Sequence, residues 1–180
     1  MCLIFHERVG GDDFYSWYVL NFFPPPNLTP CRFLGPRMVY TSGIVLDLSR
    51  EETLEELQDN KLTVVCEKLG LKPSDRLLDV GCGWGTLAAF AAKNYGCDVT
   101  GITLGKNQTK FGNDRIKTNG ITPSQARILC MDYRDIPGGP GHYTKIVSLE
   151  MAEVGSIPSV ALVPVLTSFS MLVSVATRPS

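Results

Sequence analysis

The spacing of apolar positions divides the chain into segments with different predicted structures. Residues 1–39 are rich in aromatic residues and proline and show no regular period. Between Ser49 and Leu69, apolar residues recur at spacings that line one face of a helix, namely at Leu54, Leu57, Leu62, Val65 and Leu69. Ser49 with Glu52 three residues later predicts a capping box at the helix start, and Gly70 predicts its end.

From Arg76 onward, short apolar runs alternate with helical patterns. The predicted strands are Arg76–Val80, Asp98–Leu104, Ala126–Met131 and Lys145–Leu149, and the predicted helices are Trp84–Tyr95 and Lys106–Thr118. Strands joined by helical segments of this length favour an α/β fold with a parallel sheet covered on both faces, which is a three-layer sandwich. Right-handed crossovers put each loop that follows a strand at one edge of the sheet, where ligands bind in such folds.

The last segment, residues 154–180, breaks this alternation. Arg178 is its only ionised side chain, and serine, valine, leucine and proline dominate it. Its apolar density is compatible with a membrane span, but Pro158, Pro164 and the frequent hydroxyl residues argue against one. At the other end, the first residues lack a cationic start followed by a long apolar run, so no secretory signal is predicted.

Composition and charge narrow the class of protein. A chain of 180 residues with 44% hydrophobic and 19% charged residues fits one globular domain. A formal charge of -1 provides no field for gathering nucleic acid, so no nucleic-acid partner is expected. The six cysteines form no CxxC pair and are interpreted as reduced thiols, with Cys66 in the core. His6 and His142 have no second ligand candidate nearby, and no metal site is predicted.

The loop after the first predicted strand carries the most informative motif. Residues 77–85 read LLDVGCGWG, in which the glycines have the spacing G-x-G-x-G, whereas a dinucleotide fold uses G-x-G-x-x-G to place a pyrophosphate on the helix. Glycines suit a sharp turn that a ligand approaches closely. The whole string resembles the cofactor turn of Rossmann-like S-adenosylmethionine-dependent methyltransferases. Its candidate cofactor-binding residues are Leu77, Leu78, Asp79, Val80, Gly81, Cys82, Gly83, Trp84 and Gly85.

The loops after the next three strands carry further candidates at the same edge. The second strand ends without the acidic residue that usually holds a ribose, so Thr103, Leu104 and Gln108 are expected to meet the ribose and adenine; the alternative is a capped helix start. After the third strand, Asp132 is a candidate acceptor for the adenine amino group and Tyr133 for stacking, unless the segment is only a polar turn. After the fourth, Glu150 and Glu153 are placed near a methyl acceptor or are solvated helix-start charges.

Several motifs in one order resemble a single family. They are YTSGIVLD, EETLEELQDNKL, LLDVGCGWGTLAAFAA, GITLGKNQ, DYRD and VSLEMAE. Together they resemble the cyclopropane-fatty-acyl-phospholipid synthase family, and within it the fungal sphingolipid C9-methyltransferases. The resemblance covers residues 33–153 and also Gly11 to Trp17.

This resemblance implies a class I methyltransferase fold with S-adenosyl-L-methionine as cofactor. It implies that Tyr40 and Thr41 close over the cofactor and that residues 77–84 form the main cradle. The stretch that meets the ribose and adenine is Thr103, Leu104, Gly105, Lys106, Asn107 and Gln108. Tyr133 and Arg134 are implied to flank the adenine, and Glu153 to lie near the catalytic base.

The implied reaction transfers a methyl group to an alkene carbon of a lipid chain, and loss of a proton from the resulting carbocation gives the product. In the sphingolipid branch, the product is a C9-methylated sphingoid base on ceramide or glucosylceramide. The alternatives are cyclopropane formation on phospholipid, methylation of another small molecule, and a fragment that binds the cofactor without catalysis. The full-length relatives are associated with the cytosolic face of the endoplasmic reticulum membrane through upstream segments; this chain alone is expected in the cytoplasm.

Two segments depart from the family pattern. Residues 18–32 separate GDDFYSW from FLGPRMVYTSG, and residues 154–180 replace the family sequence after Glu153. We interpret both as translated intron or an error of gene assembly, which transcript sequencing decides. The expected organisation is a lead at 1–39, the first part of the methyltransferase domain at 40–153, and an apolar tail at 154–180. A sheet that stops after about four strands leaves an uncovered edge, so marginal stability and no activity are expected of this chain.

Overall fold

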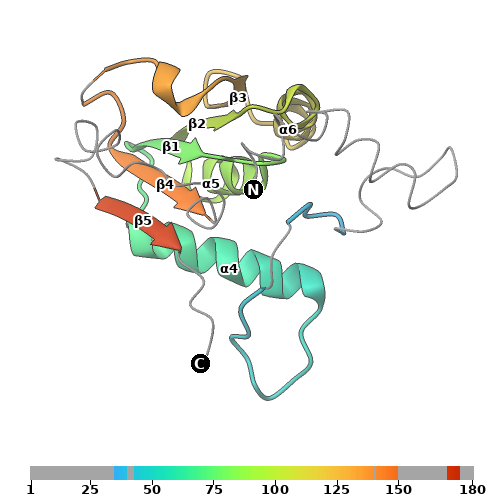
Figure 1. Ribbon diagram of the computed structural model, residues 1–180. Coiled ribbons are helices and arrows are strands. Elements are labelled where there is room, and N and C mark those ends of the chain that lie inside the picture. The colour runs from blue at the N-terminus through green and yellow to red at the C-terminus, as the bar shows by residue number, and fades with distance from the viewer. Residues whose placement is uncertain (1–34, 40–42, 140, 150–169, 175–180) are drawn as a thin grey trace, which may run out of the picture.

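The fold is built on one parallel β-sheet. A computed structural model describes residues 35–39, 43–139, 141–149 and 170–174. The sheet order is β3-β2-β1-β4-β5, and every neighbouring pair is parallel (Figure 1). The strands are β1 Arg76–Val80, β2 Asp98–Thr103, β3 Ala126–Cys130, β4 Lys145–Leu149 and β5 Ser170–Ser174. The first four match the predicted strands to within one residue at each end.

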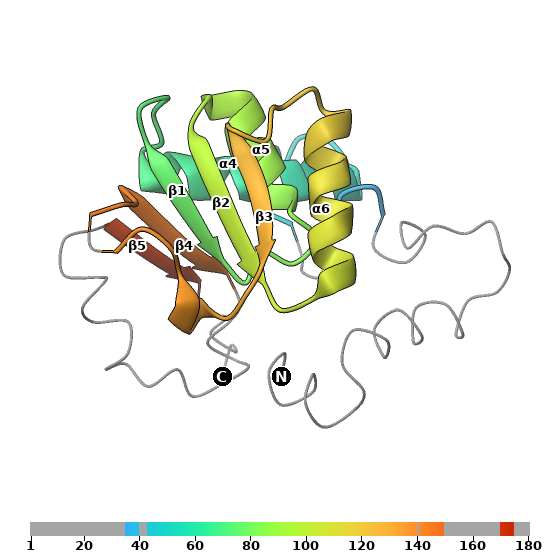
Figure 2. The same cartoon turned by 90° about the horizontal axis from the view of Figure 1, so that it is seen from above.

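The strand order reverses beside β1. The chain steps outward from β1 through β2 to β3, and then returns to place β4 on the opposite side of β1. In open α/β sheets, ligands bind outside the carboxyl ends of the strands at this switch point. All strands point the same way, so their carboxyl ends lie along one edge (Figure 2). The loop that follows β1 is therefore at the position where a ligand is expected.

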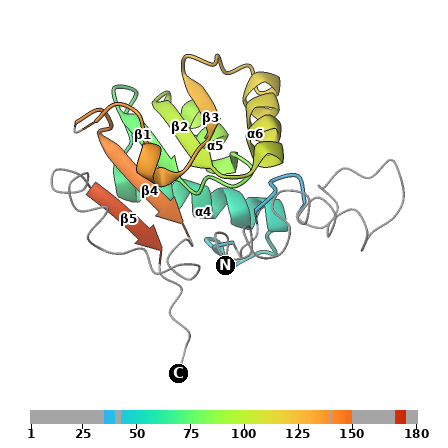
Figure 3. The same ribbon diagram turned by 45° about the horizontal axis from the view of Figure 1, so that its top comes forward.

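The sheet continues beyond the four strands expected from the sequence. β5 comes from within the apolar tail and pairs with β4 in parallel register, from Lys145 opposite Ser170 to Leu149 opposite Ser174. The two strands lie side by side, with helix α4 (Leu54–Leu69) passing close to β5 (Figure 3). The edge of β4 that was expected to be bare is thus covered by main-chain pairing.

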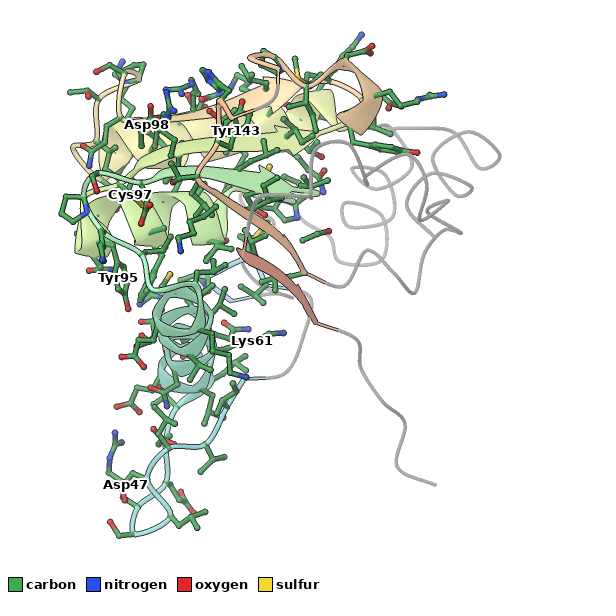
Figure 4. All side chains as sticks on the ribbon, turned by 90° about the vertical axis from the view of Figure 1, so that its left-hand side faces the viewer. Asp47, Lys61, Tyr95, Cys97, Asp98 and Tyr143 are labelled. Atoms are coloured by element: carbon green, nitrogen blue, oxygen red, sulfur yellow. The ribbon has the colours of Figure 1, made fainter. Side chains whose placement is uncertain are left out.

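Three helices pack on one face of the sheet (Figure 2). They are α4, α5 (Thr86–Tyr95) and α6 (Lys106–Thr118). Their apolar side chains form one core with the side chains that this face of the strands presents, including Leu77, Val99 and Val147. Cys66 lies in this core with no exposed surface, as predicted. On the opposite face, Leu78, Val80, Ile102, Tyr143 and Ile146 form a second buried cluster, and Figure 4 shows Tyr143 across the sheet from α4.

Helix α4 begins later than predicted. Its N-cap is Thr53, whose hydroxyl accepts from the Glu56 amide while the Glu56 carboxylate accepts from the Thr53 amide. The expected Ser49–Glu52 box does not form, because the Glu52 carboxylate accepts instead from the Leu46 amide at 3.0 Å and from Asn60 Nδ2 at 2.7 Å. These bonds close a loop that projects away from the sheet and has Asp47 near its tip (Figure 4). Leu54, expected on the buried face, is consequently exposed.

Helix α5 also starts later than predicted, at Thr86 rather than Trp84. Gly85 has a φ of 74°, in the left-handed region, so the right-handed helix cannot extend back through it. Trp84 and Gly85 therefore belong to the turn that follows β1.

Close backbone packing holds this turn against β2 and α6. A Cβ on Gly101 of β2 would lie 2.7 Å from Cδ1 of Ile128 and 2.9 Å from Cβ of Cys82. A Cβ on Gly112 of α6 would lie 2.8 Å from Cγ1 of Ile128, and one on Gly85 would lie 3.1 Å from Cα of Gly112. Side chains larger than hydrogen at these positions would push the turn, the strand and the helix apart.

We predict that Gly101→Ala destabilises the protein by about 1–3 kcal/mol, because the added methyl overpacks the contact with Ile128 and Cys82. Ile128→Val removes the Cδ1 atom that the methyl would meet. The double variant should therefore lose less stability than the sum of the two single variants. Urea denaturation of the four proteins measures this coupling, and strictly additive losses would contradict the packing explanation.

Candidate functional site

The turn that follows β1 is shaped by its own backbone hydrogen bonds. The amides of Gly81 and Cys82 both donate to the Ile102 carbonyl at 3.0 Å, which ties the turn to the end of β2. The Gly85 amide donates to the Cys82 carbonyl at 3.0 Å and closes the turn before α5. Gly81, Gly83 and Gly85 all have positive φ, of 78°, 54° and 74°. Side chains with a Cβ rarely adopt this conformation, which explains the G-x-G-x-G spacing.

Gly83 leaves open space on the outer side of the turn. A Cβ built at this residue meets no atom within 4 Å, in contrast with the crowded Gly101 and Gly112. The turn therefore combines a tightly packed inner side with an outer side that a ligand is able to approach at the level of the backbone. This is the arrangement expected of a cofactor cradle without phosphate contacts.

Asp79 brings a carboxyl group into the protein interior directly before the turn. Its side chain lies in β1, and the residue is only 3% exposed. Burial raises the pKa of this carboxyl from its ordinary value to about 7. Burial and the neighbouring Asp79 also raise the pKa of the Cys82 thiol. A buried acid next to a glycine turn is typical of ligand sites rather than of cores.

The segment after β2 brings together two of the polar residues predicted there. The Thr103 hydroxyl donates to Oε1 of Gln108 at 2.7 Å and accepts from the Gly105 amide at 3.3 Å. The hydrogen bond between Thr103 and Gln108 fixes the start of α6 beside the cofactor turn. In the same segment, Leu104 is partly buried, and Lys106 and Asn107 are exposed. The capping interpretation and the ligand interpretation are therefore compatible, because the Gln108 amide nitrogen is not used in this bond.

The segment after β3 differs in detail from the expectation. Asp132 caps the short helix η1 (Tyr133–Asp135), and both of its carboxylate oxygens accept from Arg134 at 2.8 Å. These bonds lower the pKa of Asp132. An adenine amino group would have to share this carboxylate with Arg134, rather than meet a vacant acceptor. Tyr133 is partly buried against the second apolar cluster.

Trp84 is held from behind by residues that the sequence did not single out. Its side chain is 7% exposed and packs against Met38 and Phe111, with the Phe111 ring edge-on at 5.3 Å between centroids. Arg115 of α6 lies over the Phe111 ring at 5.1 Å. One signal was present in the sequence: Gly112 is a glycine inside a helical pattern, which often marks a close approach.

Four predicted site residues, Tyr40, Thr41, Glu150 and Glu153, lie outside the described part of the chain. So do residues 18–32 and most of 154–180. Within the described ranges, no group of three or more His, Cys, Asp or Glu side chains is arranged to hold a metal ion. No helix in those ranges is long and apolar enough to cross a membrane.

The similarity of this chain to known proteins covers much more of the sequence than the turn. The family model described as mycolic acid cyclopropane synthetase matches residues 31–157. Sphingolipid C9-methyltransferase A of Emericella nidulans is 62% identical over 143 residues, which cover 79% of this chain and 25% of that protein. The chain thus spans about a quarter of the length of the curated relatives it matches.

Solved structures agree with the fold. The mycolic acid cyclopropane synthase CmaA1, complexed with SAH and CTAB, has a TM-score of 0.63 and 30% identity over 78% of this chain and 49% of that chain. The cyclopropane synthase MmaA2 from Mycobacterium tuberculosis has a TM-score of 0.54 and 35% identity over 64% of this chain and 39% of that chain. The predicted class I, Rossmann-like methyltransferase fold is confirmed. By its motifs, its sheet order and this match, the chain belongs to the mycolic acid cyclopropane synthetase family.

Proposed function

We propose that this chain binds S-adenosyl-L-methionine at the turn after β1, as the cofactor-binding part of a lipid methyltransferase. The proposed reaction is methylation at C9 of the sphingoid base of ceramide or glucosylceramide. The observation that carries the proposal is the glycine turn with its open side at Gly83, in a chain 62% identical to a sphingolipid C9-methyltransferase.

The turn fits this cofactor better than a nucleotide. S-adenosyl-L-methionine has no phosphate, and Gly81, Gly83 and Gly85 do not have the dinucleotide spacing. The cofactor carries positive charge at its sulfonium and ammonium groups, for which the buried Asp79 is a suitable counter-charge once ionised. The proposed ribose and adenine partners are Thr103, Leu104, Gly105, Lys106, Asn107, Gln108, Asp132, Tyr133 and Arg134, with Tyr40 and Thr41 closing over the cofactor.

When bound, the cofactor supplies a methyl group on a positively charged sulfur. In the proposed step, the bond from this methyl to sulfur breaks and a bond to an alkene carbon of the lipid forms. A proton then leaves the lipid, and S-adenosylhomocysteine is released. We propose that Glu153, four residues after the end of β4, lies beside the group that takes this proton. The protein's part is to keep water away from the cation and to hold the base nearby.

A second candidate reaction is cyclopropane formation on an unsaturated lipid. The matched family model, described as mycolic acid cyclopropane synthetase, favours it. Both reactions add one CH₂ to the lipid, but the proton leaves a chain carbon in methylation and leaves the transferred methyl in cyclopropane formation. The alkene therefore survives only in the methylated product.

We further propose that the full-length protein acts at the cytosolic face of the endoplasmic reticulum membrane, where its lipid substrate would be found. The support is the sphingolipid substrate in the names of relatives such as sphingolipid C9-methyltransferase A. The division into a lead at 1–39 with an insertion at 18–32, a methyltransferase segment at 40–153 and a tail at 154–180 also remains a proposal. The family match over 31–157 is compatible with it.

We predict that the chain binds S-adenosyl-L-methionine and that Gly83→Ala weakens binding at least about tenfold, because the new methyl occupies the open side of the turn. Gly120→Ala is the matched control. Gly120 also has positive φ, of 74°, and open space around its Cβ, but it follows α6 at the opposite edge of the sheet. Both variants carry similar backbone strain, roughly 1–2 kcal/mol. Isothermal titration calorimetry should show a loss of cofactor affinity in Gly83→Ala and not in Gly120→Ala. An equal loss in both variants would mean that backbone strain, and not contact with the ligand, lowers the affinity.

We predict that the full-length protein containing this segment adds one CH₂ to the sphingoid base of ceramide or glucosylceramide when S-adenosyl-L-methionine is supplied. Mass spectrometry of the released base detects the addition, and oxidative cleavage of the product locates any remaining alkene. A product that resists cleavage indicates cyclopropane formation. Failure to modify any unsaturated lipid, by a protein shown to bind the cofactor, would contradict a lipid methyltransferase.

We predict that stability in the absence of cofactor falls as the pH rises from 5 to 8. The pKa of Asp79 is about 7 in the folded protein. Its unfolded value is about 3.9, so the folded state resists ionisation and the loss should reach roughly 2–3 kcal/mol over this window. Asp79→Asn cannot ionise and should flatten the profile. Urea denaturation at each pH measures the slope; an unchanged slope in the variant would assign the pH dependence to another group.

A further inference from the structure

Arg115 of α6 connects three segments behind the cofactor turn. Its guanidinium donates to the Pro36 carbonyl at 3.0 Å and to the Arg37 carbonyl at 3.0 Å. It also donates to the Thr86 hydroxyl, at the first residue of α5, and that hydroxyl donates in turn to the Arg37 carbonyl. A single side chain therefore joins the segment 36–38, the start of α5 and the body of α6.

The same guanidinium begins a line of packed side chains that returns to the turn. It lies over Phe111, Phe111 meets Trp84 edge-on, and Trp84 packs against Met38, which is 2% exposed. Met38 directly follows Arg37, whose carbonyl Arg115 holds. The contacts thus form a closed ring that includes Trp84: Arg115 and Arg37 are joined by a hydrogen bond, and the other members are joined by side-chain packing.

The segment 36–38 is also tied to α4, on its other side. The Arg37 guanidinium forms a bidentate salt bridge with the carboxylate of Asp59, in which Nε donates to Oδ1 at 2.6 Å and Nη2 donates to Oδ2. Segment 36–38 is therefore fixed to α4, α5 and α6, and it presents Met38 to Trp84 as a rigid support. Its position does not depend on one contact: Met38 meets Trp84 of the turn directly, and Thr86 and Arg115 bind the carbonyls of the segment.

This ring matters because it packs the Trp84 side chain, which the backbone hydrogen bonds of the turn do not position. Trp84 stands between Gly83 and Gly85, both at positive φ, and glycines permit many other conformations. We infer that Arg115 is a positioning residue that fixes the conformation of the cofactor turn and thereby sets the affinity for S-adenosyl-L-methionine. The inference rests on the proposed function only for the identity of the ligand. A lysine would not replace it, because one ammonium cannot reproduce the planar fork that reaches three oxygens and covers a ring.

The test compares four variants in a Trp17→Phe background, where Trp84 is the single tryptophan. Arg115→Lys and Thr86→Val break the ring, while Thr86→Ser keeps the hydroxyl. Arg127→Met is the control away from the turn: this arginine pairs with the Asp98 carboxylate at 2.8 Å and donates to the Ser124 carbonyl at 3.1 Å, at the amino end of β3. Each protein is assayed for cofactor affinity by calorimetry, for melting temperature, and for Trp84 emission without cofactor.

We expect Arg115→Lys to weaken cofactor binding about tenfold and Thr86→Val several-fold, the scale of losing charge-assisted hydrogen bonds. Thr86→Ser and Arg127→Met should bind within about twofold of the parent, even though Arg127→Met lowers the melting temperature. Of the two arginine variants, only Arg115→Lys should shift the Trp84 emission maximum to longer wavelength. Unchanged affinity and emission in Arg115→Lys, or equal effects in Arg127→Met, would overturn the inference. If the parent does not bind the cofactor, the proposed function fails, and the emission shift still decides whether Arg115 fixes the turn.

Discussion

The cofactor turn depends on the close approach of three stretches of main chain around one isoleucine. Gly101 in β2, Gly112 in α6 and Gly85 in the turn all face Ile128 at distances that no Cβ would tolerate without movement. Because of this, β2 and α6 meet the turn at backbone distance, and the Gly81 and Cys82 amides reach the Ile102 carbonyl. The inner side of the turn is thereby set by the scaffold, while its outer side at Gly83 stays open. Preorganisation of a binding site by rigid elements is the general way in which such folds keep their affinity.

The electrostatics of the site follow from the same packing. Placing the turn directly over the sheet puts the Asp79 carboxyl in the interior, where burial raises its pKa to about 7. A core that served stability alone would not retain such a group, since an uncompensated buried charge is costly. By contrast, the polar residues after β2 and β3 are already hydrogen-bonded within their own loops, Thr103 to Gln108 after β2 and Asp132 to Arg134 after β3. The acid beneath the turn is therefore the group whose state a cationic ligand would change most.

The sequence predicted the parts of this molecule that depend on local patterns. The four strands, the glycine turn and the polar residues at the carboxyl edge all follow from apolar runs and turn residues, and β1 to β4 match closely. The predicted start of α4 was wrong because two neighbouring pairs, Ser49 with Glu52 and Thr53 with Glu56, both satisfy the capping pattern. The tertiary contacts of Glu52 with Leu46 and Asn60 decide between them. Arg115 and Met38 were missed because their roles come from tertiary contacts between residues that are far apart in the sequence. β5 was missed because the tail offered no alternation to mark it.

Helix α4 joins regions that are made at very different times. Its Asp59 holds Arg37 from the early part of the chain, and the helix also contacts β5, which is the last of the described strands in chain order. Contacts between segments so far apart in sequence form late, since the intervening chain must first close a long loop. On the ribosome, β1 to β4 are complete before β5 emerges, so α4 has to wait with part of its surface uncovered. Within the described part of the chain, β5 is thus the strand that pairs last: until it does so, α4 and the edge of β4 stay open to chaperones and proteases.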